Sequence, residues 1–335
     1  MNRAIRSVVV VLVAVAPSSA SELNVRGVLD AREGAVRAVA FSPDGKTVAS
    51  WYDPSTIKIW DVATRRNSAT IHAEDAGTAV SIVYSPDGGT VAVAGYCPGI
   101  IRCWDVPTGR TTITIDDHVG VTGSVAFAPD GKTFATAWEY PNSVKLRDAS
   151  TGMEITWINE GSCRPVAFSP DGKTLASAGA HAEIILWDVA SRKSVARLAG
   201  RGGPFDRVAG LAFAPAGKTL ASSVSVTELS KGGRPKTPWV TRWVIDLWDL
   251  ASRKTTFTLV GYSATFSPDR KTLASCDPDG AIDLWDLATG TKIAKAVGDT
   301  DALRSLAFSP DGKTLASGSV DGTIKLWDVK MTGRR

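Results

Sequence analysis

Histidine and cysteine are the residue types in this chain that could bind a metal or carry out catalysis, and their spacing argues against both. The three histidines, His72, His118 and His181, have no acids or cysteines beside them at metal-ligand spacing. The sequence also contains no nucleophile elbow, zinc-protease helix, phosphate-binding loop or calcium loop. We therefore predict no catalytic residue, no metal site and no cofactor, and a chain that is not an enzyme.

The four cysteines, Cys97, Cys103, Cys163 and Cys276, include no Cys-x-x-Cys pair. This spacing favours buried thiols. Cys97 and Cys103 flank a predicted hairpin turn, where their positions are offset rather than opposed. A disulfide between them is the alternative.

Aspartate recurs at one position of a tight turn, which indicates a structural role. The copies are Asp44, Asp87, Asp130, Asp171, Asp269 and Asp311. A catalytic carboxylate is needed once or as a pair, so this repetition argues against catalysis. Asp246 and Asp283 occupy a different position, at which other repeats have Lys58, Lys145 and Lys325. We expect these two aspartates to adjust surface charge rather than to form an acid pair.

Aromatic and basic residues gather in predicted turns and suggest a binding surface. Turns that read Gly318-Ser319-Val320-Asp321-Gly322 in the plainest repeat contain Trp51, Tyr52, Tyr96, Trp138 and Tyr140 in others. An insertion at 227–242 adds Lys231, Arg234, Lys236, Trp239 and Trp243. Because protein-binding surfaces are enriched in Trp and Tyr, we predict that these residues bind a partner. The alternative is that the aromatic side chains pack between repeats and that the insertion is a solvated loop, which its glycine and proline keep from being helical.

Seven copies of one pattern position these residues. The segment VAFSPDGKTVAS at 39–50 returns as LAFSPDGKTLAS at 306–317, with five related copies between them. Each copy predicts a strand, a proline-glycine turn and a second strand, followed by a third strand and a short fourth one. Six third strands end in Trp-Asp and one in Arg147-Asp148; the others are Trp60-Asp61, Trp104-Asp105, Trp187-Asp188, Trp248-Asp249, Trp285-Asp286 and Trp327-Asp328. Four strands in about 42 residues predict one blade of a propeller.

On these motifs the chain resembles bacterial WD40-repeat proteins, over about residues 23–330. The resemblance implies an all-β, seven-bladed β-propeller of four-stranded antiparallel blades whose first strands line a central channel. The predicted blades cover about 36–72, 79–115, 123–158, 163–198, 208–260, 262–297 and 303–328. The seventh copy lacks an outer strand, and residues 24–29 are expected to supply it and so remove an open sheet edge. Residues 331–335 form a tail.

Many WD40 blades carry a histidine before the first strand that joins a network with a serine or threonine, the tryptophan and a turn aspartate. Only His118 fits that position here, and Arg32, Asp75 and Asp299 stand at matching places in other repeats. A hydrogen bond contributes a net ~1 kcal/mol, whereas burying a large apolar side chain contributes ~1.5 to 3 kcal/mol. We therefore expect packing to hold these blades together.

The N-terminus has the pattern of an export signal. Arg3 and Arg6 precede an apolar run at 7–16, and residues 17–20 suit a signal-peptidase site. The run is about half of the ~20 residues that span a bilayer, so we predict cleavage after about Ala20 and a periplasmic or secreted protein. A membrane anchor is the alternative; no later stretch is apolar enough to span.

These observations favour a non-catalytic scaffold, a monomeric propeller that binds a protein or peptide. With 38 basic and 34 acidic residues, the chain has no overall charge to attract a nucleic acid. The alternative is an enzyme or small-ligand binder that uses the central channel. It would require polar residues on the first strands, whereas residues 38–41, 125–127, 166–168 and 306–308 are apolar.

Overall fold

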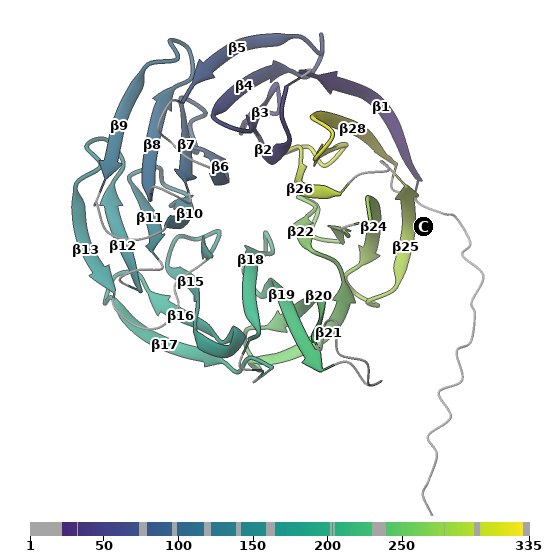
Figure 1. Cartoon of the computed structure of the whole chain (residues 1–335). Coiled ribbons are helices and arrows are strands. Elements are labelled where there is room, and N and C mark those ends of the chain that lie inside the picture. Colours follow the sequence, from purple (N-terminus) through teal and green to yellow (C-terminus); the bar gives the residue numbers. More distant parts are fainter. Residues whose placement is uncertain are drawn as a thin grey trace, which may run out of the picture.

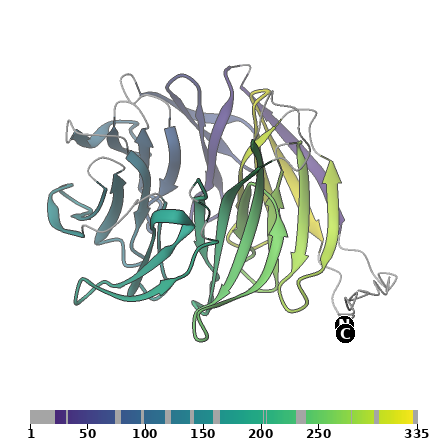
Figure 2. The same ribbon diagram turned by 60° about the horizontal axis from the view of Figure 1, so that its bottom comes forward.

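The seven repeats fold into seven four-stranded antiparallel sheets, which stand as blades around a central axis in a computed structural model (Figure 1). The predicted fold class is confirmed. The structure describes residues 22–31, 33–73, 79–95, 99–116, 122–138, 142–158, 165–201, 203, 205–229, 239–277, 279–297 and 302–330. Figure 2 shows the strands of neighbouring blades side by side, with their turns at the two faces of the ring.

Within a blade the strands follow one another outward from the axis. Blade one contains β2 (Val36–Phe41), β3 (Thr47–Tyr52), β4 (Thr56–Asp61) and β5 (Asn67–His72). Blade two contains β6 (Ala79–Tyr84), β7 (Thr90–Gly95), β8 (Ile100–Asp105) and β9 (Thr111–Asp116). Blade three contains β10 (Thr122–Phe127), β11 (Thr133–Trp138), β12 (Ser143–Asp148) and β13 (Glu154–Ile158). Blade four contains β14 (Val166–Phe168), β15 (Thr174–Ala178), β16 (Ile184–Asp188) and β17 (Lys193–Leu198), with the 3-10 turn η1 (Ala180–Ala182) between β15 and β16.

The remaining blades follow the same order until the ring closes. Blade five contains β18 (Arg207–Phe213), β19 (Thr219–Leu229), β20 (Trp239–Asp249) and β21 (Lys254–Val260). Blade six contains β22 (Ser263–Phe266), β23 (Thr272–Cys276), β24 (Ala281–Asp286) and β25 (Lys292–Val297). Blade seven contains β26 (Leu303–Phe308), β27 (Thr314–Ser319), β28 (Thr323–Lys330) and, as its outer strand, β1 (Glu22–Asp30).

Closure by the N-terminal strand is confirmed, and this strand is longer than the predicted 24–29. β1 runs antiparallel to β28, from Glu22 opposite Lys330 to Asp30 opposite Thr323. A bulge at Arg26 lets its guanidinium donate to the Thr314 hydroxyl at 3.2 Å. The first and last strands of the chain therefore complete one sheet and leave β28 without an open edge.

The turn after each first strand is built by the residues that recur in the sequence. The Ser42 hydroxyl donates to the Asp44 carboxylate at 2.7 Å and accepts the Thr47 N–H at 3.0 Å, while Gly45 takes a φ of +70°. The Lys46 N–H and the Ser42 hydroxyl lower the pKa of Asp44 below its usual 3.8. The same Ser-Asp bond recurs in four other blades, at Ser85-Asp87, Ser169-Asp171, Ser267-Asp269 and Ser309-Asp311. These aspartates stabilise turns, as predicted.

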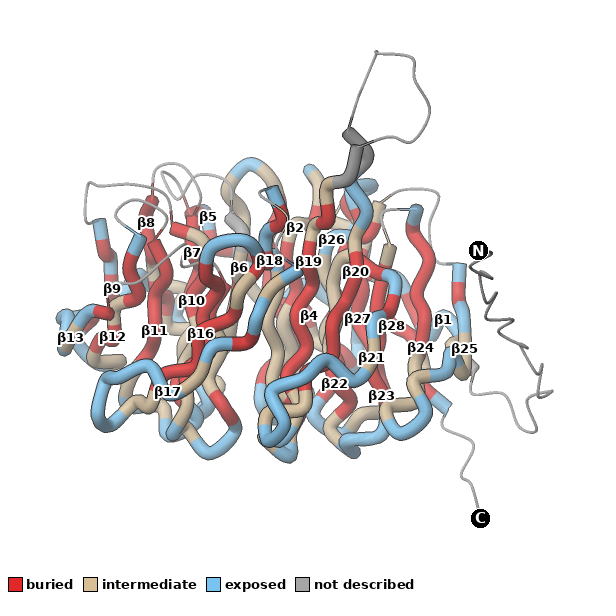
Figure 3. The backbone as a smooth tube through the Cα atoms, turned by 90° about the horizontal axis from the view of Figure 1, so that it is seen from below, coloured by how far each residue is buried: buried red, intermediate tan, exposed pale blue. Residues whose placement is uncertain are grey.

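The core lies between adjacent blades rather than within any one of them. One cluster joins Trp51 and Ile57 of blade one to Ile82, Val91 and Trp104 of blade two. Figure 3 shows the resulting distribution, with buried residues along the strands and exposed ones at many of the turns. Because each blade is buried on both faces, its middle strands are apolar on both sides.

Part of the polar network typical of WD40 blades is present and adds to the packing between the blades. In five blades the tryptophan indole N–H donates to a serine hydroxyl on the second strand. These bonds are Trp60 to Ser50 at 2.9 Å, Trp187 to Ser177 at 2.8 Å, Trp248 to Ser222 at 2.9 Å, Trp285 to Ser275 at 2.8 Å and Trp327 to Ser317 at 2.9 Å. In blade three, where Arg147 replaces the tryptophan, Trp138 donates to the Thr136 hydroxyl at 3.1 Å.

Both ends of the insertion in blade five are strand, which corrects the prediction of a loop over the whole of 227–242: residues 227–229 belong to β19 and residues 239–242 to β20. β19 and β20 pair continuously from Thr219 opposite Asp249 to Leu229 opposite Trp239. The extension forms because Val224 and Val226 are buried against Ala182 of blade four. Only residues 230–238 of the insertion lie outside the described part of the chain. No helix among the described residues has the length and apolarity that crossing a membrane requires.

Candidate functional site at the channel mouth

Three of the predicted binding aromatics are buried, so for them the prediction of a binding surface is wrong. Trp51 and Tyr52 are 0% exposed and Trp138 is 1% exposed. The sequence placed them in turns, but β3 continues through Tyr52 and β11 through Trp138. As strand residues they pack against the neighbouring blades, which was the alternative interpretation.

Of the other predicted binding residues, the structure places one side chain. Tyr96, Tyr140, Lys231, Arg234 and Lys236 lie outside the described residues, and the backbone of Trp239 begins β20. The Trp243 side chain is partly exposed and meets the Tyr262 ring edge to face, with 4.6 Å between the ring centroids. This pair joins blade five to the start of blade six.

Both rings line a cavity of about 850 Å³ at one end of the central channel. The lining includes residues near the start of first strands, Ser225 within β19, Gly179 just after β15 and Trp243 of β20. This is the face of the ring that the sequence predicted for a partner. We call this cavity the channel mouth; its principal side chains are Arg37, His181, Arg207, Trp243, Tyr262 and Arg304.

A β-bulge near the start of the first strand gives the mouth two of its arginines, Arg37 and Arg304. The register of five first strands shifts by one residue there, and the extra residue is left without a partner in the ladder. The extra residues are Arg37, Val80, Gly123, Ala209 and Arg304. Arg37, Gly123, Ala209 and Arg304 line the mouth. The bulge therefore brings an arginine to the mouth in blades one and seven.

The mouth is basic. Its described lining includes three arginines, Arg37, Arg207 and Arg304, and a single acid, Asp206. Asp206 is 5% exposed and accepts the N–H groups of Gly203 and Thr227, both at 3.2 Å. Arg37 donates to Asp53 at 2.6 Å, which holds its guanidinium in place. Arg207 and Arg304 are exposed.

Sequence reasoning missed the arginines and Tyr262. The sequence predicted apolar first strands. This prediction is correct deeper in the channel, where Val83, Val125 and Phe168 line a second cavity of about 480 Å³. At the mouth it does not hold. A signal was present: Arg37 and Arg304 occupy the same position of their repeats, in VRAVAF and LRSLAF.

His181 adds a strained group to the mouth. His181 and Ala182, in η1, have φ angles of +54° and +59°, a region that residues other than glycine seldom occupy. His181 is exposed and lines the cavity. Such strain persists only where the surroundings impose it, and it concentrates at binding and catalytic sites.

The other candidates for chemistry have structural roles in the described part of the chain. Cys103 and Cys276 are buried free thiols, as predicted, and burial raises the pKa of each to about 12. Cys97, Cys163 and His118 lie outside the described residues. No group of three or more His, Cys, Asp or Glu side chains could hold a metal ion among the described residues.

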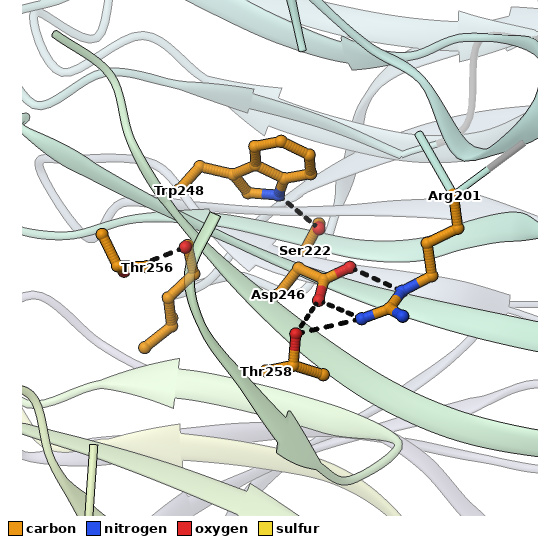
Figure 4. Close-up of polar contacts among 7 residues, drawn as sticks. Arg201, Ser222, Asp246, Trp248, Thr256 and Thr258 are labelled. Carbon is orange, nitrogen blue, oxygen red and sulfur yellow. Dashed lines mark hydrogen bonds and ion pairs between the residues drawn. The ribbon is translucent and has the colours of Figure 1, made fainter. Parts of the chain in front are cut away.

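Asp246 and Asp283 are buried ion-pair partners, which corrects the prediction that they adjust surface charge. A charged residue two positions before the tryptophan, or before Arg147 in blade three, is paired in four blades. The pairs are Lys58 with Glu33 at 2.8 Å, Lys145 with Glu154 at 3.1 Å, Asp246 with Arg201 at 2.5 Å and Asp283 with Lys292 at 2.5 Å. Figure 4 shows the Arg201 guanidinium against Asp246, with the Thr258 hydroxyl donating to the same carboxylate. A carboxylate held in this way is suited to structure rather than to proton transfer.

Comparison with known families identifies the repeats. The family model described as WD domain, G-beta repeat matches residues 162–188, 255–286 and 290–328, which contain strands of blades four to seven. A second model, described as Eukaryotic translation initiation factor eIF2A, matches residues 19–147, which reach from before β1 into β12. No curated protein matches the chain. These three segments therefore match WD40 repeats, within a chain whose seven blades form a β-propeller.

Proposed function

We propose that this chain is a non-catalytic scaffold that binds a protein or peptide at the channel mouth. One observation carries the proposal: the partly exposed Trp243–Tyr262 pair stands in an arginine-lined cavity on the ring axis. Tryptophan, tyrosine and arginine are the residue types that dominate binding energy at protein interfaces. WD40 propellers commonly serve as protein-interaction scaffolds, which supports the same role.

The experiment compares two tryptophans that differ in place. Trp243→Ala removes a ring at the mouth, whereas Trp157→Ala removes an exposed ring from β13, on the rim of blade three. Immobilised wild-type and variant chains are exposed to cell extract, and bound proteins are identified by mass spectrometry. Because a central aromatic residue contributes ~2 kcal/mol or more, Trp243→Ala should reduce recovery of the specific partner about 30-fold.

The control should leave recovery within about twofold of wild type, since most residues outside a binding centre contribute little. If Trp157→Ala abolishes capture while Trp243→Ala leaves it intact, the mouth is not the binding site. Equal melting temperatures for the three proteins ensure that the comparison reports binding rather than folding.

A small-ligand role is the second candidate, and the size of the mouth favours it. A volume of about 850 Å³ lies within the range of small-molecule sites, and the lining offers several polar groups. A catalytic use would need an acid, base or nucleophile free to react. Asp206, the acid in the described lining, is engaged by two backbone N–H groups, whereas the exposed His181 imidazole in the same lining is a candidate base.

We also propose that the protein acts outside the cytoplasm, after removal of residues 1–20. The basic start and short apolar run of the N-terminus support this. The match to the eIF2A family raises translation initiation as a competing setting, which would keep the unprocessed chain in the cell. N-terminal sequencing of the purified protein separates the two: a start near Ser21 supports export, and an intact Met1 overturns it.

A further inference from the structure

The charge of the channel mouth differs from the charge of the whole chain. Overall, 38 basic residues face 34 acidic ones. In the described lining of the mouth there are three arginines, of which Arg37 is paired with Asp53, and one aspartate, Asp206. Attraction for anions is therefore concentrated at the axis, where low-dielectric walls focus the field.

Two of the arginines stand on adjoining strands. Arg37 and Arg304 are the bulge residues of β2 and β26, and these strands are joined by the Val39 N–H, which donates to the Ser305 hydroxyl at 3.1 Å. Asp53 holds Arg37, whereas Arg304 is exposed and makes no ion pair with any described residue. Arg304 can therefore bind a carboxylate without breaking an ion pair to any residue in the described part of the chain.

The backbone at the mouth suits an extended peptide. The first strand of every blade is an edge strand whose open side faces the channel. Each bulge also leaves one residue outside the ladder. Main-chain N–H and C=O groups exposed in this way pair with an extended chain laid beside them, while nearby side chains select its sequence.

The Trp243–Tyr262 pair supplies apolar contact beside Arg207, the first residue of β18. A peptide with carboxylates and small or apolar residues would satisfy Arg304, the rings and the open backbone together. A nucleic acid needs a longer basic track than this mouth offers, since its affinity comes from many phosphate contacts.

We propose that the mouth binds an extended acidic peptide segment, with a carboxylate paired to Arg304 and the neighbouring chain against Trp243 and Tyr262. The inference rests on the proposed function and specifies the chemistry of the partner. Because the pair forms at a partly solvated mouth, it should contribute selectivity and sensitivity to salt.

The test uses two fluorescein-labelled synthetic peptides, one alternating glutamate with serine and one alternating glutamine with serine, measured by fluorescence anisotropy with the full chain. We expect the glutamate peptide to bind about 10-fold more tightly than the glutamine peptide at low salt, with the difference shrinking as salt is raised. Arg304→Glu should weaken binding of the glutamate peptide by about 10-fold or more. The matched control, Arg110→Glu, reverses an exposed charge in the turn between β8 and β9, at the opposite face, and should change binding less than about twofold.

Equal affinity for the two peptides, or full binding by a stably folded Arg304→Glu variant, would overturn the inference. Tighter binding of an oligothymidylate of the same length than of the glutamate peptide would also overturn it, because the mouth would then be a site for phosphate groups. The proposed function is tested separately. If a partner is still captured through Trp243 but the glutamate peptide does not bind, the chain is a scaffold whose partner is not acidic.

Discussion

Replacing Arg201 with alanine should leave the Asp246 carboxylate buried without its strongest partner. Asp246 is 2% exposed and receives two bonds from the guanidinium, at 2.5 and 3.0 Å. Only the bond from the Thr258 hydroxyl, at 2.7 Å, would remain. Breaking a buried ion pair in this way costs about 3 to 5 kcal/mol. Because the Arg201 side chain is 32% exposed, the lower end applies, about 3 kcal/mol.

The same reasoning predicts a rescue. In blade four the matching position is occupied by Ile185, which is 0% exposed, so the fold accepts an apolar residue there. Adding Asp246→Ile to Arg201→Ala removes the stranded charge and should restore most of the lost stability. Exchanging a buried ion pair for apolar groups is often close to neutral.

Thermal unfolding followed by circular dichroism measures both effects. A loss of about 3 kcal/mol should lower the melting temperature of Arg201→Ala by roughly 4 °C, and the double variant should recover most of it. Arg110→Ala, an exposed arginine elsewhere, serves as the control and should melt like wild type. If Arg201→Ala melts within about 1 °C of wild type, or the double variant melts no higher than the single one, the argument from an uncompensated charge is refuted.

Three further outcomes follow from the fold. Ser177→Ala removes the acceptor of the Trp187 indole N–H and should cost about 1 kcal/mol in urea unfolding, and an unchanged midpoint would mean that the bond contributes nothing. Deleting residues 22–30 opens the edge of β28 and should cause aggregation seen by light scattering; a deletion variant that melts normally as a monomer would contradict closure by β1. Hydrogen bonds, of which the one from the Ser150 hydroxyl has the largest effect, lower the pKa of Asp148 from 3.8 to about 2. The ionised carboxylate therefore stabilises the fold above pH 3.8, and this stabilisation is lost as the pH falls through 2. Asp148→Asn should therefore show a smaller loss of melting temperature between pH 5 and pH 2 than wild type, and parallel curves would exclude the mechanism.

The fold could be predicted because its information is local and repeated. A turn such as Ser42 to Thr47 is stabilised by bonds among its own residues, and the third strand ends in a recognisable Trp-Asp pair. Seven repetitions of such a segment leave few architectures open. Ring closure also followed from the sequence, because the seventh copy lacked a strand that the N-terminus could supply.

Strand ends were harder to predict, and the errors about the aromatics came from them. In a half-buried strand, alternation of apolar and polar residues marks the sides. The second strands here are buried on both faces, so alternation is absent and nothing local separates the end of β3 from the turn after it. Trp51 was therefore assigned to a turn, although it is a core residue of the interface between blades one and two.

Burial of a charge depends on partners that are distant in the sequence. Asp246 is paired by Arg201, which lies 45 positions earlier in the chain. No spacing rule connects the two, because they meet only after β17 leads into the next blade. The sequence shows that Asp246 stands where other repeats have lysine, but it does not show that Arg201 pairs with this aspartate. That pairing is visible only in the folded structure.

The bulged position explains how a repeated fold acquires a single site. Most strand residues are constrained twice, by a ladder partner and by packing against the next blade. A bulge residue lacks the ladder partner, so a change there costs the fold little. Across five blades this position holds Arg37, Val80, Gly123, Ala209 and Arg304, while the strands on either side keep the same pattern. Selection for a ligand can therefore act at the axis, one blade at a time, without disturbing the turns and tryptophans that hold the ring together.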